Sequence, residues 1–482
     1  MFTQPHGDLQ LPDRRMWLDG MGTGLGGMAL AWLLARDGKA RGASSDYTSG
    51  AQGPHFAPKA KRVIQIFHPG GISHLDSFDY KPDLAKQDGQ EVKGKKMELF
   101  FGQPGRVMKS PFAFKQYGES GTWVSDLFPH LARRADDMTF LHGMIAKSSN
   151  HTPAGFQMNT GFVQSGFPSV GSWVQYALGS ETDDLPAYVV LPDPRGLPAG
   201  GAINWSSGFL PATYQGVPFQ TSGSGPLVEN LTTPVSIDPR SRAEGLALLE
   251  KLNGDYAATR PLDENLKARI RSYSLTGRLQ ATIPLVADLS NEPKHIQRLY
   301  GLDQPTVEPF ARNCILARRL LERGVRFVQM FHGGAFGSPR INWDGHEDVR
   351  ENHATQAALI DQPFAALMAD LKSRGMWDDT LILWTTEFGR TPITQGLGAK
   401  GRDHHPFAFT IWMAGAGLKP GHHGATDELG FAVTEGRSTI YDFHATVLHL
   451  LGLDHTRLNY YSNGVKRRLT DVHGELIESV LA

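Results

Sequence analysis

The sequence is poor in cysteine, in excess charge and in long apolar runs. Cys314 is the only cysteine among 482 residues, so an internal disulfide framework is excluded. Cys314 lies in a segment of helical periodicity, which favours a buried structural thiol over a nucleophile. Lys and Arg (48) nearly balance Asp and Glu (49), and the resulting net charge of -1 argues against binding to nucleic acid.

Motifs of several common enzyme classes are also missing. No GxGxxG follows a predicted strand, and neither a P-loop nor a GxSxG motif is present. Nucleotide-binding folds and serine hydrolases of the usual kinds therefore lose their main support. The 19 histidines, many of them close to aspartate, point instead toward metal chemistry.

The N-terminus has the order of residues found in an export signal. Arg14 and Arg15 form a twin-arginine pair, a glycine-rich, mildly apolar segment follows at 21–35, and small residues follow at 40–44. We interpret residues 1–43 as a twin-arginine export signal, which predicts use of the twin-arginine export machinery and a periplasmic or extracellular location. The alternatives are an uncleaved N-terminal helix or a chance arginine pair. The apolar segment is too short for a stable membrane span.

Short apolar runs typical of strands recur along the rest of the chain, and helical patterns such as 309–323 and 355–375 separate them. This alternation predicts an α/β fold with a doubly wound, mostly parallel central sheet flanked by helices. Residues 44–60 are predicted to be a polar linker, 61–482 one large domain, and 192–239 a Gly- and Pro-rich loop excursion. The predicted strands are Arg62–His68, Met138–His142, Ala187–Leu191, Val325–His332, Leu381–Thr385 and Phe409–Met413.

Carboxylates and histidines follow several of these strands at once. After the first strand, the turn Gly70-Gly71 leads to Asp76 and Asp79, which either bind a metal or cap the next element. After the strand at 325–332 come Asp344 and His346 in a flexible WDGH segment. Carboxylate and imidazole together suit Zn²⁺ or Mn²⁺, and the alternative is a solvated acidic loop.

A second pair of candidate segments surrounds the strand at 381–385. Glu387 ends this apolar run, where a buried carboxylate needs a partner, either a metal or Arg390. Asp403, His404 and His405 come about one loop later, directly before the next apolar strand. They are predicted metal ligands, and a surface turn is the alternative.

A helix start is predicted around His151 and Thr152. Asn150 suits the N-cap position and Pro153 the first helical turn. A helix N-terminus favours an oxyanion, so a nucleophile or anion ligand at His151 or Thr152 would be assisted there. The alternative is a capped helix without a site.

Taken together, these motifs resemble those of a family of exported bacterial proteins catalogued as domain of unknown function 1501. The resemblance extends from about residue 61 to the C-terminus. The family is placed in the alkaline phosphatase and sulfatase superfamily, which implies an alkaline-phosphatase-like central sheet with metals at the strand ends. The segments that carry the resemblance are GGISHLDSFDYKP, MNTGF, WDGH, LKSRGMWDDTLILWTTEFGRTP, GRDHHPFAFTIWMAGAGLKPG and DFHATVLHLLGLDH.

The resemblance also implies roles for single residues. Asp76 and Asp79 fall where the superfamily has its first acidic ligand, and Asp344 and His346 resemble its later acid and histidine ligands. Glu387 stands where relatives carry Asp.

Two positions depart from the superfamily pattern. Phe388 replaces an expected histidine beside Glu387, so the resemblance implies that His404 or His405 substitutes for it. His151 stands where sulfatases carry the cysteine that becomes formylglycine, which excludes formylglycine chemistry. Thr152 or His151 is then the candidate nucleophile.

The leading hypothesis is an exported metal-dependent hydrolase of phosphate or sulfate esters, acting on a small-molecule or glycan ester. It would use one or two divalent ions, with Zn²⁺ or Mn²⁺ favoured, since Ca²⁺ would want more oxygen ligands. Thr152, His151 or a metal-activated water would attack, and Arg390 or Arg402 would neutralise the developing charge. The alternatives are a non-catalytic exported binding or assembly protein, and a transferase such as a phosphomutase. The predicted metal ligands are Asp76, Asp79, Asp344, His346, Glu387, Asp403, His404 and His405.

Overall fold

The computed structural model describes residues 53–92, 104–222, 225–228, 238–261, 263–337 and 339–482. The chain divides into two units, Met1–Gly50 and Ala51–Ala482, and the described residues belong to the second. The predicted export signal and the first part of the predicted linker lie outside the described residues. Within the described residues, no helix combines the length and the apolar character needed to cross a membrane.

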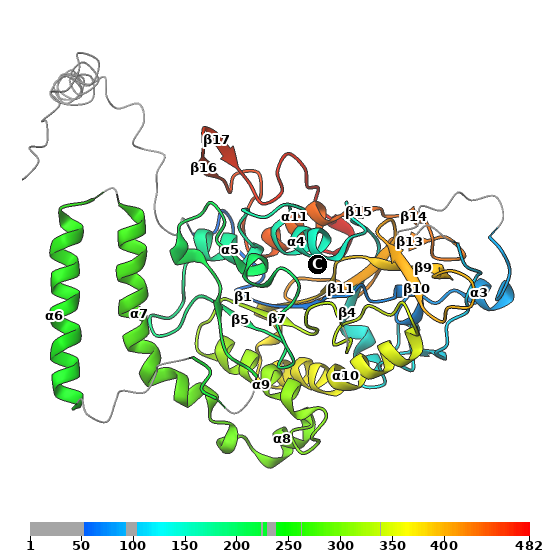
Figure 1. The fold of residues 1–482 in the computed structure, drawn as a ribbon, viewed down its shortest axis with the longest axis horizontal. Coiled ribbons are helices and arrows are strands. Elements are labelled where there is room, and N and C mark those ends of the chain that lie inside the picture. The colour runs from blue at the N-terminus through cyan, green and yellow to red at the C-terminus, as the bar shows by residue number, and fades with distance from the viewer. Residues whose placement is uncertain (1–52, 93–103, 223–224, 229–237, 262, 338) are drawn as a thin grey trace, which may run out of the picture. The chain divides into compact units, whose positions relative to one another are not determined.

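A nine-stranded sheet forms the centre of the second unit (Figure 1). Its strands are β1 (Arg62–His68), β4 (Met138–Ile145), β5 (Tyr188–Leu191), β6 (Val217–Pro218), β7 (Phe327–Phe331), β8 (Thr380–Thr386), β11 (Phe409–Gly415), β12 (Gly421–His423) and β15 (Ser438–Thr439). Their spatial order is β12-β4-β11-β8-β1-β7-β5-β6, and β15 also pairs with β4. β1 pairs in parallel with β7 and β8, whereas β11 is antiparallel to β4 and β8.

This mostly parallel sheet confirms the predicted fold class, and each of the predicted strands lies in it. The strands were recognisable because they are buried on both faces, so their sequences are nearly continuous apolar runs. In β1 the side chains alternate between two cores. Ile64 and Ile66 join one core, while Val63 and Phe67 join the other.

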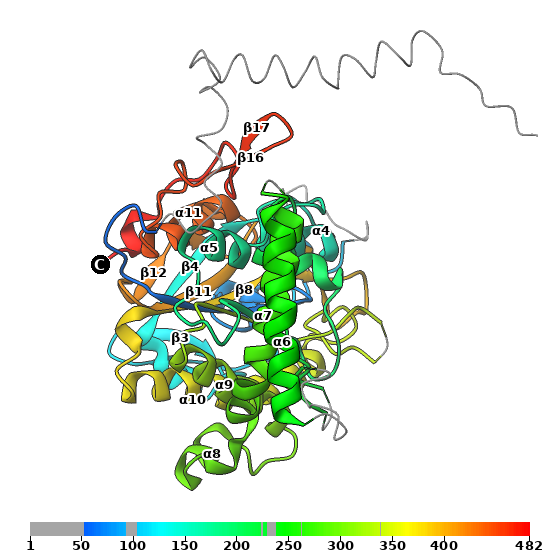
Figure 2. The ribbon, with the colours of Figure 1, turned by 90° about the vertical axis from the view of Figure 1, so that its left-hand side faces the viewer.

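Helices cover the two faces of the sheet (Figures 1 and 2). On one face lie α4 (His151–Thr160), α5 (Val170–Leu178) and α11 (Ile440–Leu450). On the other lie α8 (Lys294–Tyr300), α9 (Glu308–Glu322) and α10 (Val349–Ser373). The two helical patterns in the sequence correspond to α9 and α10, and Cys314 is buried in α9.

Two long helices, α6 (Pro239–Ala258) and α7 (Glu264–Ala287), lie at the side of the sheet (Figure 2). Leu279, Ile283 and Val286 of α7 pack into the core, whereas the described side chains of α6 are exposed or half-buried. The predicted excursion at 192–239 contains two short 3-10 helices, Gly201–Trp205 and Ala212–Tyr214, and the edge strand β6.

Short elements complete the described fold. They are α3 (Pro82–Lys86) and the strand pairs β2–β3 (Phe114–Tyr117, Thr122–Ser125), β9–β10 (Gly389–Thr394, Arg402–His405), β13–β14 (Ala425–Thr426, Val433–Glu435) and β16–β17 (Tyr460–Ser462, Val465–Arg467). The Asp403-His404-His405 run lies in β10, a strand held in antiparallel register against β9, with His404 opposite Arg390. This pairing fixes the direction of each side chain in the run.

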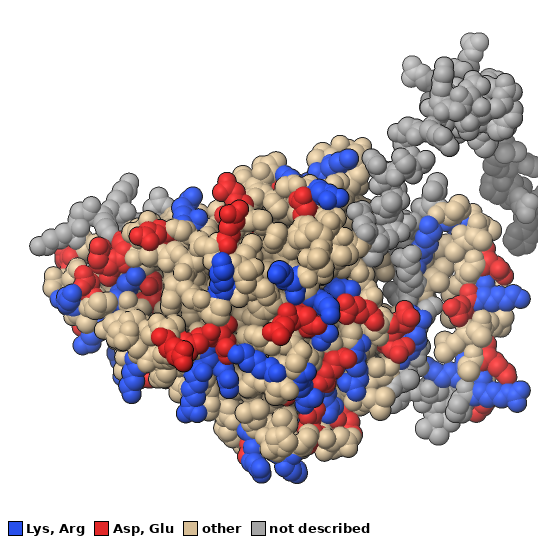
Figure 3. Space-filling view, turned by 180° about the vertical axis from the view of Figure 1, so that it is seen from behind, with Lys and Arg blue, Asp and Glu red and all other residues tan. Residues whose placement is uncertain are grey.

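Charged side chains of both signs are mixed on the surface. On the face drawn in Figure 3, Lys and Arg lie among Asp and Glu across the described residues. Positive and negative side chains are therefore mixed on that face, in keeping with their near balance in the whole sequence.

Candidate metal centre

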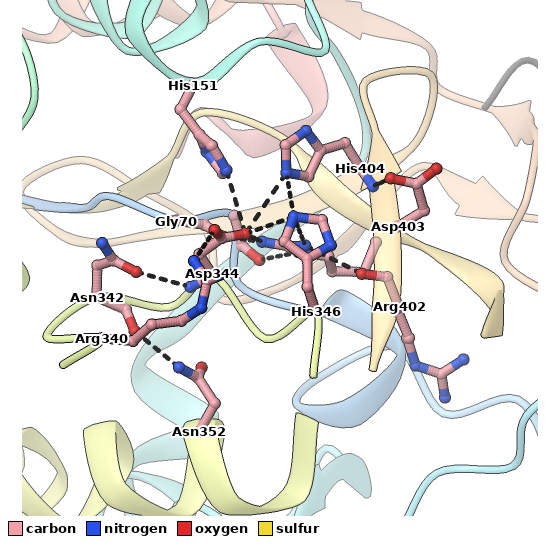
Figure 4. Close-up of polar contacts among 12 residues, drawn as sticks. Gly70, His151, Arg340, Asn342, Asp344, His346, Asn352, Arg402, Asp403 and His404 are labelled. Carbon is pink, nitrogen blue, oxygen red and sulfur yellow. Dashed lines mark hydrogen bonds and ion pairs between the residues drawn. The ribbon is translucent and has the colours of Figure 1, made fainter. Parts of the chain in front are cut away.

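Four side chains meet where the parallel strands of the sheet end (Figure 4). They are His151 at the start of α4, Asp344 and His346 in the loop between β7 and α10, and His404 in β10. One nitrogen or carboxylate oxygen from each residue lies within 4.8 Å of those of the other three. We call these four residues the His–Asp cluster.

Asp344 Oδ1 lies at the centre of the cluster. The Nε2 atoms of His346, His151 and His404 lie 2.8, 3.2 and 3.5 Å from this oxygen. The Nε2 atoms of His346 and His404 are 2.8 Å apart. Three imidazole nitrogens and one carboxylate oxygen, all converging on one place, form a ligand set that Zn²⁺ and Mn²⁺ accept.

The four side chains of the cluster are almost fully buried. The side chains of His151, His346, Asp344 and His404 are 11%, 7%, 6% and 2% exposed. Polar atoms at this depth need partners within the protein or from a bound ligand, because bulk water does not reach them freely.

A main-chain carbonyl fixes the tautomer of His404. Its Nδ1 lies 2.6 Å from the carbonyl oxygen of Ser149. Because a carbonyl only accepts, the Nδ1 atom carries the proton, and in the neutral ring Nε2 presents a lone pair to Asp344 and His346. Metal-binding histidines are commonly oriented in this way by a hydrogen bond from the other ring nitrogen.

Glu387 orients the ring of His151 in the same way. The Nδ1 of His151 lies 2.7 Å from Glu387 Oε1, so the Nε2 atom faces Asp344. Glu387 is itself held by the backbone N–H of Gly70 at 2.7 Å and by the Thr386 hydroxyl at 3.2 Å. Glu387 therefore lies beside the cluster and positions one of its members.

The electrostatics favour an ionised carboxylate and shift the pKa values of the three imidazoles in different directions. Burial would raise the pKa of Asp344, but Arg390 and the three histidines outweigh it and hold that pKa well below its usual range. Burial lowers the pKa of His404 to about 2, and burial and Arg390 lower the pKa of His346. Burial also works to lower the pKa of His151, but its bonds to Asp344 and Glu387 raise it.

Two arginines neutralise Asp344. Arg390 is fully buried and donates from Nη2 to Asp344 Oδ1 at 2.7 Å. It also donates to the carbonyls of Gly71 at 2.9 Å and Arg402 at 3.0 Å, so its position is fixed by the backbone around it. Arg340 donates to the other oxygen of Asp344, and its side chain is 30% exposed.

Close backbone contacts hold the loop of Asp344 against the end of β1. Gly70 has φ +113°, and a Cβ on it would lie 2.4 Å from the backbone nitrogen of Asp344. Only glycine tolerates this approach. Asn342 then fixes the loop, since its Oδ1 accepts from the Asp344 N–H at 3.1 Å and its own carbonyl accepts from Asn352 at 3.0 Å (Figure 4).

The structure brings together four of the predicted site residues as direct members of the cluster, namely His151, Asp344, His346 and His404. Glu387 and Arg390 contact members of the cluster directly. Asp403 accepts from the backbone N–H of the neighbouring His404 at 2.8 Å.

The other predicted residues make different contacts. Asp76 forms a two-point ion pair with Arg402, with donor–acceptor distances of 2.7 and 3.1 Å. Asp79 pairs with Lys81 at 3.0 Å and accepts from Thr426. The remaining two are His405, whose Nε2 donates to the carbonyl of Phe431 at 2.6 Å, and Thr152, whose hydroxyl makes no hydrogen bond within the part of the chain that the structure describes.

Sequence reasoning missed three contributors to the site. Arg340, the backbone N–H of Gly70 and the carbonyl of Ser149 all contact the cluster or its supports. The two backbone groups carry no signal in a residue pattern. Arg340 lies in an irregular loop, where its spacing to Asp344 predicts no contact.

The residues present fit a divalent metal ion. The His404 Nε2 lone pair and Asp344 Oδ1 face each other at 3.5 Å, and neither atom carries a proton of its own. A cation beside both atoms would meet a lone pair and a negative charge. His151 and His346 complete a buried set of three imidazoles and one carboxylate, which are the ligands that Zn²⁺ and Mn²⁺ share.

Several solved structures are similar to this chain at low identity. The lipoteichoic acid synthase LtaP from Listeria monocytogenes is 10% identical, with 89% of this chain and 78% of that chain covered and a TM-score of 0.39. A protein in the alkaline phosphatase superfamily from Vibrio parahaemolyticus is 13% identical (85% and 71% covered, TM-score 0.34). The PsFucS1 sulfatase from Pseudoalteromonas sp. is 10% identical (82% and 68% covered, TM-score 0.34). At these TM-scores, the similarity carries no argument about activity.

Comparison of the sequence with known protein families is more informative than the similarity to these structures. No curated protein matches the chain in sequence. A family described as "Protein of unknown function (DUF1501)" matches residues 60–481, which is most of the chain and includes the whole His–Asp cluster. The resemblance seen in the sequence motifs is thereby confirmed, and the chain belongs to the DUF1501 family.

Proposed function

We propose that this protein is an exported, metal-dependent hydrolase of phosphate or sulfate esters. The observation that supports it best is the convergence of three imidazole Nε2 atoms on one oxygen of Asp344. Two of the rings are aimed by hydrogen bonds from their Nδ1 atoms to a carbonyl and a carboxylate. Such orientation of histidine rings by their second nitrogen is common at metal sites and supports a bound cation here.

The ligand set narrows the metal. Three nitrogen ligands and one oxygen favour Zn²⁺ or Mn²⁺ over Ca²⁺, which prefers oxygen. The cluster supplies ligands for one ion, because Asp76 is paired with Arg402 and Asp79 with Lys81. When bound there, the ion would polarise an ester oxygen as a Lewis acid.

Three arginines near the cluster differ in their contacts and so in their proposed roles. Arg390 is fixed by backbone carbonyls and keeps Asp344 ionised. Arg340 is partly exposed and pairs with Glu347 at 2.6 and 2.7 Å as well as with Asp344, so it would have to exchange the Glu347 contact to bind the anionic oxygens of an ester. Arg402 is paired with Asp76, so we assign the reaction no step at Arg402.

His151 lies between two carboxylates. Its ring lies between Asp344 and Glu387, which raise its pKa against the effect of burial. To become a ligand, the ring must present the lone pair of Nε2 to the metal. Glu387 keeps the Nδ1 proton in place throughout.

Thr152 is the one hydroxyl candidate for a covalent step. It occupies the second residue of α4, next to His151, and its backbone N–H is capped by Asn150. If Thr152 is the nucleophile, replacing it with Ala abolishes turnover. If water attacks directly, the Thr152→Ala variant keeps most of the activity.

The substrate and location follow from the sequence motifs. Arg14 and Arg15 support export by the twin-arginine route, and the superfamily resemblance supports a small-molecule or glycan ester. Formylglycine chemistry is excluded at His151, so sulfate and phosphate esters both stay open as substrates.

The test uses the purified full-length protein. Elemental analysis is expected to find Zn or Mn near one ion per chain, and a panel of aryl phosphates and sulfates is expected to be hydrolysed. Removal of the metal with a chelator should abolish hydrolysis, and adding the metal back should restore it. Metal-free protein with no activity on the panel would contradict the proposal.

A non-catalytic role is the second candidate, and the low exposure of the cluster favours it. No cluster side chain is more than 11% exposed, as in a metal site that serves structure. This candidate predicts a stoichiometric metal that chelators remove slowly, together with a blank substrate panel and a lower melting temperature after metal removal.

A further inference from the structure

His151 is the most exposed member of the His–Asp cluster, and an aromatic ring covers it. The ring of Phe336 stacks on the His151 imidazole, with centroids 4.1 Å apart and planes inclined by 22°. Phe336 is half-buried, while its neighbours Ala335 and Gly337 are exposed. The ring therefore lies between the cluster and solvent.

The other sides of His151 are occupied by the protein. Phe388, which is fully buried, lies 4.9 Å from its ring, and the ring of His404 lies 4.2 Å away. Glu387 and Asp344 hold the two nitrogens. Of the rings that contact His151, Phe336 is the one on a surface loop.

Hydrogen bonds hold both ends of the loop that carries Phe336. The Gly333 N–H donates to Asp193 at 2.6 Å, and the Gly334 N–H donates to the carbonyl of Ile341 at 3.0 Å. Asn342 donates to the carbonyl of Ala335 at 3.2 Å. These bonds hold the loop ends in place and do not involve the Phe336 ring.

Glycines lie on both sides of Phe336. Gly333 has φ +138° and Gly337 has φ +151°, backbone conformations that side chains with a Cβ rarely adopt. A Cβ at Gly337 would meet no atom within 4 Å, so the space beside it is open. The segment can therefore turn the ring outward while its anchored base stays in place.

We propose that Phe336 is a gate that controls access to the His–Asp cluster. With the ring stacked on His151, the cluster is closed to solutes. With the ring turned outward, an ion or an ester reaches His151 and Asp344. What passes through the gate rests on the proposed function, but the gate itself does not.

Chemical modification of His151 tests the gate directly. Full-length, metal-depleted protein is treated with diethyl pyrocarbonate, and the rate of carbethoxylation of each histidine is followed by peptide mass spectrometry. In the Phe336→Ala variant, His151 should be modified at least about fivefold faster, the factor that corresponds to loss of one aromatic pair. His422, which is exposed, serves as an internal reference and should react at an unchanged rate.

Two further variants make the result decisive. Phe407→Ala removes another partly exposed phenylalanine, whose ring contacts His405 rather than the cluster, and should leave His151 unchanged. Phe336→Trp keeps a larger ring in place and should react no faster than the parent protein. Equal rates for His151 in the parent and in folded Phe336→Ala protein would overturn the gate, and if that variant does not fold, the same comparison with Phe336→Leu decides.

The readout separates the gate from the proposed function. Carbethoxylation requires neither bound metal nor turnover, so a protein without metal still reports on Phe336. Conversely, if Phe336 does not control access, the metal content and the results of the substrate panel still test the proposed function.

Discussion

Asp344 and Asp76 are both buried carboxylates near the ends of neighbouring strands, yet their surroundings differ. Asp76 faces donors only, namely the Arg402 guanidinium at 2.7 and 3.1 Å and the Ser73 hydroxyl at 2.5 Å. Asp344 also meets arginines, but its Oδ1 is shared with three imidazole nitrogens. Donors of the protein account for the contacts of Asp76, whereas Asp344 also lies among potential metal ligands.

The comparison shows why acidic residues after a strand do not by themselves indicate a metal site. A two-point guanidinium pair satisfies both oxygens of Asp76 without a metal. Both oxygens of Asp344 also accept from arginines, but three imidazole nitrogens lie beside its Oδ1, and His404, oriented by its Nδ1 atom, presents a lone pair there. Four predictions follow, from the largest expected effect to the smallest, and three of them test this distinction.

Replacing Asp76 with Ala should have the largest effect, and on stability only. Arg402 would be left buried and unpaired, which costs about 3–5 kcal/mol of the free energy of unfolding. Thermal or urea unfolding measures the loss, and metal per folded molecule should be unchanged. The double variant Asp76→Ala/Arg402→Met removes both charges and should regain most of the stability. Loss of metal from folded Asp76→Ala protein would break the comparison.

Acid should weaken the fold independently of the metal. Burial lowers the pKa of His444 to about 4, below the value near 6.5 in the unfolded chain. Its contribution to stability is complete above pH 6.5 and is lost as the pH falls toward 4, by about 3 kcal/mol.

Urea unfolding of metal-depleted protein between pH 7 and 4 measures this dependence. The Nε2 of His444 donates to the carbonyl of Met158 at 2.9 Å, so His444→Gln can keep a donor there without titrating. The variant should show a shallower pH dependence. An unchanged slope would mean that other groups cause the acid sensitivity.

Adjacent histidines in β10 offer a matched pair for the metal site. His404→Ala removes a cluster member and should weaken metal affinity by more than about 100-fold, beyond the range for residues that only orient a ligand. His405→Ala removes a buried ring that bonds Phe431 and should leave metal affinity unchanged. Competition with a chromogenic chelator measures both. Equal losses in the two variants would count against the cluster as the metal centre.

Glu387→Gln should have the smallest effect of the four. The amide oxygen still accepts from His151 Nδ1 but without a negative charge, so His151 becomes a weaker ligand. Metal affinity should fall by about 10-fold, at the low end for orienting residues. A loss as large as that of His404→Ala would make Glu387 a ligand itself.

The sequence was sufficient for six of the nine strands of the sheet and for part of the candidate site. Strands buried on both faces are apolar runs, so β1, β7 and β8 could be located together with the polar residues beyond them. Because parallel strands end at one edge, Asp344 and Glu387 were expected near one another.

The partners of each polar group could not be predicted in the same way. Whether Asp76 meets a metal or Arg402 depends on a contact between residues 326 positions apart. Arg390 was considered as a partner of Glu387, but in the structure it bonds Asp344. Such choices depend on the pairing of β9 with β10, which no local residue pattern encodes.

The carbonyl of Ser149 has a consequence for how the site tolerates change. Because a main-chain atom sets the tautomer of His404, no side-chain replacement at position 149 removes that control. A change of side chain at this position is therefore expected to leave the His–Asp cluster unaltered. Insertions or deletions in the 146–150 segment are different, since they shift the carbonyl relative to β10, so the length of this connection is expected to be under stronger selection than its composition.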